Sequence, residues 1–161
     1  MRTRILTTVK QSRLTIAVAA VLVFMGCHER RPYHHYQSVN APQWAMTDTM
    51  RFTQDQIERE GDYTVGVGVR VNDHFAYRNL WLVVEQRSKK GLVRHRDTVN
   101  MILADSKGTW LTQGVVLHET EETVGKTRLE RDEAYEFLVY HIMSKQQLVG
   151  VKDVGLSLSP D

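Results

Sequence analysis

Residues 63–71 alternate between large apolar side chains and small or polar ones, and this pattern restricts the fold more than any other feature. The odd positions hold Tyr63, Val65, Val67, Val69 and Val71, and the even positions hold Thr64, Gly66, Gly68 and Arg70. Because successive side chains of a strand point to opposite faces, the segment predicts a strand with one buried face. Glycines on the other face predict a bulge or the close approach of another backbone.

Similar short segments follow along the chain, separated by turn sequences. The predicted strands are residues 49–52, 63–71, 79–85, 94–103, a pair of strands around Gly114 within 110–117, 134–142 and 154–158. The predicted turns are residues 72–74, 88–91 and 105–108. The charged residues 118–132 indicate a long exposed loop, and residues 143–148 a single helical turn. Many short strands at this spacing predict an all-β antiparallel β-sandwich, of jelly-roll or immunoglobulin-like topology.

The N-terminal region has a different character, because residues 14–25 are apolar except for Thr15. Basic residues precede this run without any acidic residue, and Gly26 and Cys27 follow it. A basic head, a short apolar middle and a small-residue end are typical of an export signal, and the run is shorter than the roughly 18 residues of a membrane span. We therefore expect a signal peptide over residues 1–26, a tether over 27–42 and a single sandwich domain over 43–161.

Cys27 is the sole cysteine, so an internal disulfide is excluded. A thiol directly after Gly26, at the end of the apolar run, is where a bacterial lipoprotein carries its acyl chains. Residues 24–27 resemble a lipobox, although Phe24 stands where leucine or valine is usual. We expect Cys27 to be lipidated and to fix the protein to a membrane. The alternative is an unmodified, buried cysteine.

The charge distribution argues against a nucleic-acid partner. Four of the 21 Lys and Arg residues, but none of the 19 Asp and Glu residues, lie within residues 1–26, so the rest of the chain is slightly acidic. Its largest basic cluster, at Lys89, Lys90, Arg94 and Arg96, is predicted to be a solvated hairpin tip.

No set of residues predicts catalysis or metal binding. Glu119, Glu121 and Glu122 crowd into the predicted loop, where solvent exposure is more common than a glycosidase arrangement. The adjacent side chains of His34 and His35 diverge in an extended segment, and no third ligand is indicated. A nucleophile elbow, a phosphate-binding glycine loop and a paired-histidine zinc motif are all missing. We expect no enzyme activity, no cofactor and no metal.

Several blocks of sequence, taken in order, resemble the gliding-motility-associated lipoprotein GldH family of Bacteroidetes. They are residues 77–82, 105–110 followed by Gly114, 141–143 and 148–156, together with Trp44 and Arg70. The resemblance implies a non-enzymatic cell-envelope lipoprotein, an accessory or scaffold component associated with gliding-motility machinery. Its expected partners are a membrane, through the acyl chains on Cys27, and envelope proteins of a motility or secretion machine.

Trp44, Trp110 and Arg70 form the predicted surface for a partner or ligand. The alternative for Trp44 and Trp110 is that they close the end of the sandwich, as large rings at the beginnings of strands commonly do. Aromatic rings on β-sandwiches can stack on sugars, so the alternative function is a glycan- or small-ligand-binding envelope lipoprotein. Trp81 lies within an apolar run and is expected in the core.

Two finer expectations concern location and modification. Surface lipoproteins of this phylum tend to carry an acidic run after the lipidated cysteine, whereas here Glu29 is followed by Arg30 and Arg31. We therefore expect the periplasmic face of the outer membrane. Thr49 and Thr98 each lie in an Asp-Thr-apolar triplet, a weak indication of O-glycosylation.

Overall fold

The computed structural model describes residues 33–57, 59–112, 114 and 116–161. The chain divides into two units, Met1–Arg30 and Arg31–Asp161, and every described residue belongs to the second. The predicted signal peptide and Cys27 lie outside the described residues. Among the residues described, no helix is long and apolar enough to cross a membrane.

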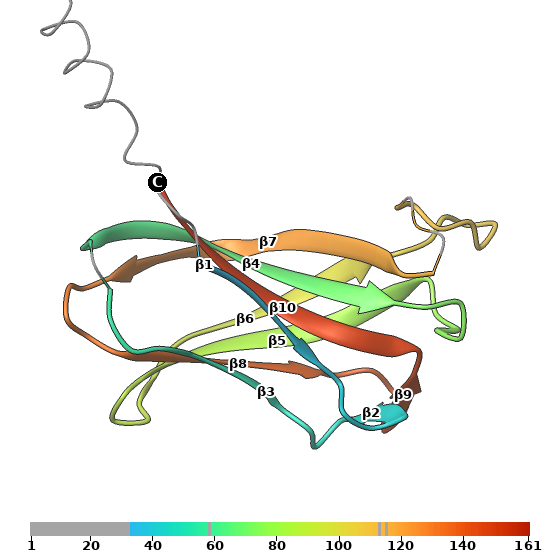
Figure 1. Ribbon diagram of the computed structural model, residues 1–161, viewed down its shortest axis with the longest axis horizontal. Helices are drawn as coiled ribbons and strands as arrows, with labels where there is room; N and C mark the ends of the chain where they lie inside the picture. Colours follow the sequence, from blue (N-terminus) through green and yellow to red (C-terminus); the bar gives the residue numbers. More distant parts are fainter. Residues whose placement is uncertain (1–32, 58, 113, 115) are drawn as a thin grey trace, which may run out of the picture. The chain divides into compact units, whose positions relative to one another are not determined.

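The described part of the chain is built from antiparallel strands without a helix, which confirms the all-β prediction (Figure 1). The strands are β1 (Tyr33–Ser38), β2 (Gln43–Ala45), β3 (Met50–Gln54), β4 (Gly61–Val71), β5 (Asn79–Ser88), β6 (Val93–Ile102), β7 (His118–Leu129), β8 (Tyr135–His141), β9 (Gln147–Val149) and β10 (Val151–Pro160).

Two four-stranded sheets form the sandwich. The β1 sheet has the order β1-β10-β4-β7, and the β5 sheet has the order β3-β8-β5-β6. The short strands β2 and β9 pair separately. When these two are set aside, the strand order in both sheets is that of a jelly roll, one of the two topologies that the sequence left open.

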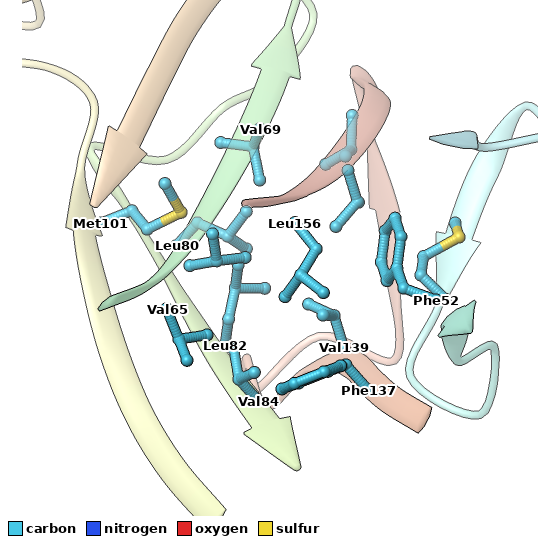
Figure 2. Packing of buried hydrophobic residues seen from close by; sticks show 14 of the residues in the cluster. Phe52, Val65, Val69, Leu80, Leu82, Val84, Met101, Phe137, Val139 and Leu156 are labelled. Carbon is cyan, nitrogen blue, oxygen red and sulfur yellow. The ribbon is translucent and has the colours of Figure 1, made fainter. Parts of the chain in front are cut away.

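The core lies between the two sheets. The odd-numbered valines of β4 are at most 6% exposed, as the alternation predicts. Figure 2 shows Val65 and Val69 of β4 close to Leu80 and Leu82 of β5. Burying each such side chain stabilises the fold by about 1.5–3 kcal/mol, so the apolar alternation is the main source of sheet-to-sheet packing.

Most of the predicted strands are confirmed. Residues 49–52, 79–85, 94–103, 134–142 and 154–158 correspond to β3, β5, β6, β8 and β10 with small shifts of their ends. The two-faced apolar run of β5 predicted a central strand, and β5 does lie between β8 and β6.

The predicted tether is wrong over Tyr33–Ser38, which forms β1 and pairs with β10. The strand shows no apolar alternation because His35, which remains exposed, and Gln37 occupy two of the three positions that face the β5 sheet. His35 packs edge-on against Phe52 at 6.3 Å between ring centroids, and the side-chain amide of Gln37 donates to the Arg51 carbonyl at 2.6 Å. The sandwich therefore begins at Tyr33 rather than at residue 43.

The predicted exposed loop over residues 118–132 is also wrong, because His118–Leu129 forms β7. This edge strand pairs with β4 along its whole length. Its inner face carries few apolar residues, so the backbone ladder rather than a hydrophobic pattern holds it. Charged side chains on such an edge discourage pairing with other chains.

Two smaller predictions fail at the same end of the sandwich. Within the described part of residues 110–117 there is no strand, and the pairing there is a single bridge between Ala104 and Trp110. Residues 143–148 contain no helical turn, and β9 begins at Gln147.

The two ends of the sandwich differ in what they contain. The leading end holds the start of β1, the end of β10 and the connections 55–60, 89–92 and 130–134. The cross-strand pairs Tyr33–Leu158, Tyr63–Pro160, Gly61–Leu129, Gln54–Tyr135 and Ser88–Tyr135 bring these segments together. The far end holds the connections 39–49, 72–78, 103–117 as described, and 142–150. In Figure 1 the leading end lies on the left and the far end on the right.

Candidate functional site

Tyr36 lies across the outer face of the β1 sheet, over two glycines. A Cβ at Gly68 would be 2.2 Å from the Tyr36 hydroxyl, and a Cβ at Gly155 would be 2.7 Å from the ring. The opposite-face glycines of β4 predicted close approach by another backbone or a bulge. Here Gly68 admits a side chain instead, and a register shift occurs between Val65 and Gly66.

Arg70 lies at the centre of a cluster that also contains Tyr36, Glu119 and Asp153. Its guanidinium lies 4.0 Å from the centroid of the Tyr36 ring, and its Nε donates to Oε2 of Glu119 at 2.7 Å. The Tyr36 hydroxyl donates to the other oxygen of Glu119 at 3.3 Å, and Asp153 lies 4.0 Å from Arg70 Nη1. The hydrogen bond to Glu119 raises the pKa of Arg70. The cluster fastens β1 to β4 and β7.

The pKa of Tyr36 is raised above 10.0, first by burial and then by the charges of Glu119 and Glu121. The folded state thus prefers the neutral phenol, so this stabilisation is present below pH 10 and is lost as the pH rises further. We expect Tyr36→Phe to show a shallower loss of stability above pH 10 than the wild type. The difference is at most about tenfold in the unfolding equilibrium constant per pH unit.

Denaturant unfolding at a series of alkaline pH values measures this slope. The pKa values of Tyr33 and Tyr135 are also raised by burial, and both residues remain in the variant, so the comparison isolates Tyr36. Parallel stability curves for the two proteins would contradict the prediction.

No pair of carboxylates arranged for catalysis is formed among Glu119, Glu121 and Glu122. Glu119 and Glu121 lie on the outer face of the β1 sheet, where Glu121 accepts a hydrogen bond from Ser157 and lies 3.5 Å from His34. Glu122 is the next residue of the same strand, so its side chain points to the opposite face. Within the described residues, no group of three or more His, Cys, Asp or Glu side chains has the arrangement of a metal site.

Trp44 is fully buried, so its prediction as a surface residue is wrong. Its indole N–H donates to the Asp48 carbonyl at 2.8 Å, and its ring meets the His141 ring edge-on at 5.0 Å. Burial lowers the pKa of His141, which favours a neutral imidazole. Trp44 closes the far end from the inside.

Trp110 is half-buried and stacks on His118, with ring centroids 4.3 Å apart. His118 in turn lies 3.1 Å from the Asp73 carboxylate. This stack joins the connections 72–78 and 103–117 to the start of β7.

Trp81 is 41% exposed, so its prediction as a core residue is wrong. Leu80 and Leu82 point inward from β5, which leaves Trp81 on the outer face of the β5 sheet. Ile142 lies beside it, donating its N–H to the Trp81 carbonyl at 3.0 Å, and Ile102 lies on the neighbouring strand β6. We call Trp81, Ile102 and Ile142 the apolar trio.

Exposed apolar residues concentrate at the far end. Those at the far end are Met46, Trp81, Ile102, Leu111, Val116, Leu117, Ile142 and Val149, whereas Leu92 and Val93 lie at the leading end. The sequence does not reveal this concentration, because Leu111 and Leu117 lie in a segment whose apolar residues predict strands.

A surface hollow of about 410 Å³ also lies at the far end. It is lined by Ala41, Pro42, Gln43, Ala45, Thr47, Asp48 and Gln147. The lining contains no aromatic ring on which a sugar could stack.

Comparison with known proteins gives one family match. A model described as GldH lipoprotein matches residues 31–158. A "Gliding motility lipoprotein GldH homolog" of Christiangramia forsetii is 26% identical over 152 residues, covering 89% of this chain and 92% of that protein. The "Gliding motility lipoprotein GldH" of Flavobacterium johnsoniae is 26% identical over 99 residues, covering 62% of this chain and 60% of that protein.

Two solved structures that match the chain resemble it only weakly. Eiger TNF from S. frugiperda is 10% identical, with a TM-score of 0.36, covering 82% of this chain and 95% of that chain. Dimeric latent PorU from Porphyromonas gingivalis is 10% identical, with a TM-score of 0.37, covering 81% of this chain and 13% of that chain. Likenesses at this level carry no information about function.

Proposed function

The chain belongs to the GldH lipoprotein family, and from this premise we propose that it is a non-enzymatic accessory or scaffold component of the gliding-motility machinery. The family is one of lipoproteins, so the chain is associated with a membrane of the cell envelope. The working surface in this proposal is the far end of the sandwich, which contacts envelope proteins.

The observation that carries the proposal is the concentration of exposed apolar side chains at the far end. Trp81, Ile102 and Ile142 are 41%, 42% and 45% exposed, and the two isoleucines lie on either side of Trp81, one directly after β8 and the other at the end of β6. Contiguous apolar surface of this kind costs solubility and typically marks a protein interface. Tryptophan is also among the residues that contribute most to binding energy. Trp110 belongs to the same end, and Arg70 borders it on β4.

The attachment is proposed to be a lipidated Cys27, exposed by removal of a signal peptide over residues 1–26. The basic pair Arg30 and Arg31, in place of an acidic run, favours the periplasmic face of the outer membrane. Because β1 begins at Tyr33, the chain enters the sandwich at the leading end.

The polar clusters support a role without catalysis. Arg70, Glu119 and Tyr36 satisfy one another across the β1 sheet. Similarly, Arg87 donates to the buried carboxylate of Glu85 at 2.5 Å. Charges that are paired in this way stabilise strand arrangements and leave no group poised in a cleft.

Replacing Trp81 and Ile142 together by glutamate is expected to abolish partner binding. Removing one hot-spot residue typically costs at least about 2 kcal/mol, so the double variant should bind at least about 30-fold more weakly. Affinity capture from detergent-solubilised envelopes, with quantitative mass spectrometry, measures this loss.

The matched control is Thr53→Glu, which adds a charge to an exposed position of β3 on the same face of the β5 sheet. It should retain the partners. Failure of the wild-type protein to retain any envelope protein in stoichiometric amount would contradict the proposal, and so would equal retention by the double variant.

A further inference from the structure

The hairpin tip between β5 and β6 carries an unusual combination of exposed side chains. Leu92 and Val93 are 62% and 54% exposed, the only exposed large apolar residues at the leading end of the described chain. Three exposed cations surround them, namely Lys89, Lys90 and Arg94. None of the ion pairs among the described residues involves these three cations.

The tip is a defined turn rather than a loose loop. The N–H of Gly91 donates to the Ser88 carbonyl at 2.8 Å, and the N–H of Ser88 donates to the Leu92 carbonyl at 2.9 Å. The N–H of Lys89 donates to the Ala134 carbonyl at 3.1 Å, which braces the tip against the connection after β7. These hydrogen bonds fix the backbone of the turn that carries the exposed Leu92 and Val93.

The position of the tip relative to the start of β1 is the second observation. Ser88 pairs with Tyr135 at the leading end, where β1 also begins at Tyr33. Only residues 28–32 separate Tyr33 from Cys27. Six residue steps span at most about 20 Å, even when fully extended. If Cys27 is acylated, the leading end cannot move far from the lipid.

We propose that the β5–β6 tip docks on the lipid surface to which the protein is anchored. Leu92 and Val93 enter the boundary between headgroups and acyl chains, while Lys89, Lys90 and Arg94 contact anionic headgroups. The contact orients the sandwich so that its far end faces away from the bilayer. This inference rests on the proposed lipidation of Cys27.

The acidic residues of the neighbouring connection restrict the contact to the tip. Glu130, Asp132 and Glu133 follow β7 beside the tip, and with Arg131 among them this connection has a net negative charge. An anionic surface repels these carboxylates, so a flat contact over the whole leading end is disfavoured. The sandwich is therefore tilted relative to the membrane, and the β5–β6 tip is the part closest to the lipid.

An environment-sensitive fluorophore at position 92 tests the contact. The full mature lipoprotein carrying Leu92→Cys is labelled with NBD and reconstituted into phosphatidylcholine vesicles with and without phosphatidylglycerol. We expect a blue shift, and quenching by lipids carrying a spin label on the acyl chain at least about threefold greater than for the same probe on Val149→Cys at the far end.

Charge variants give the matched comparison. Replacing Lys89, Lys90 and Arg94 by glutamine should remove the extra quenching that phosphatidylglycerol produces. Replacing Lys107 and Lys145 by glutamine, which lie at the far end, should leave it unchanged.

Each way in which the proposal can fail gives a different experimental result. An intact mass without acyl chains on Cys27 overturns the proposed anchor and this inference with it. An acylated protein whose position-92 probe stays in water overturns only the contact of the tip. A blue-shifted probe that spin-labelled lipid does not quench indicates burial against protein, such as a second copy, and also overturns it.

Discussion

Replacing Gly150 by alanine is expected to lower the free energy of unfolding by about 2–5 kcal/mol. Gly150 joins β9 to β10 with a φ of 90°, in the left-handed region that costs other residues about 1–2 kcal/mol. A Cβ there would also lie 2.3 Å from the backbone nitrogen of Phe75. Backbone atoms cannot swing aside as a side chain can, so the far end must open to admit the methyl group.

Two other glycines separate these causes. Gly91 has a φ of 78° with nothing within 4 Å of the place that an alanine methyl group would occupy, so Gly91→Ala should cost only about 1–2 kcal/mol. Gly61 has neither a positive φ nor a close neighbour, so Gly61→Ala should be neutral or stabilising by up to about 1 kcal/mol. Denaturant unfolding of the three variants tests the order. Equal losses at positions 150 and 91 would show that the close approach to Phe75 contributes nothing.

Replacing Cys27 by alanine is expected to release the protein from membranes almost completely. Each buried methylene of an acyl chain contributes about 0.8 kcal/mol, so two or more chains hold a protein nearly permanently. The β5–β6 tip presents only two apolar side chains and cannot replace them. Membrane fractionation and the intact mass of the product measure the loss.

The matched control for this change is His28→Ala, which alters the residue after the cysteine and leaves the thiol in place. It should fractionate with membranes and keep the acyl mass. If the Cys27→Ala protein stays in the membrane fraction after residues 1–26 have been removed, or if the wild-type mass includes no acyl chains, the lipid anchor is refuted.

The strands with apolar alternation could be predicted because their burial is a local property. In β4 the odd-numbered residues alone show which face is inside. In β5 the consecutive apolar residues Leu82, Val83 and Val84, which are buried on both faces, show that the strand lies inside a sheet. The turns at residues 72–74 and 88–91 could be predicted from their own residues in the same way.

The edge strands could not be predicted, because distant backbone pairing holds them. β1 pairs with β10 at the other end of the chain, and the ring of Tyr36 needs Gly68 and Gly155 beneath it. β7 pairs with β4 although its sequence is rich in glutamate. Neither segment contains a signal of these partners, because they lie far away in the sequence.

The sequence alone determined that this chain is an all-β sandwich of a lipoprotein family. The alternation of apolar and polar residues and the family motifs are both local patterns of neighbouring residues. The tertiary structure alone decided that Trp44 is buried, that Trp81 is exposed and that the apolar residues collect at one end. The physical reason is that a side chain's exposure depends on what packs against its face of the sheet. In this jelly roll, that packing is supplied by strands remote in the sequence.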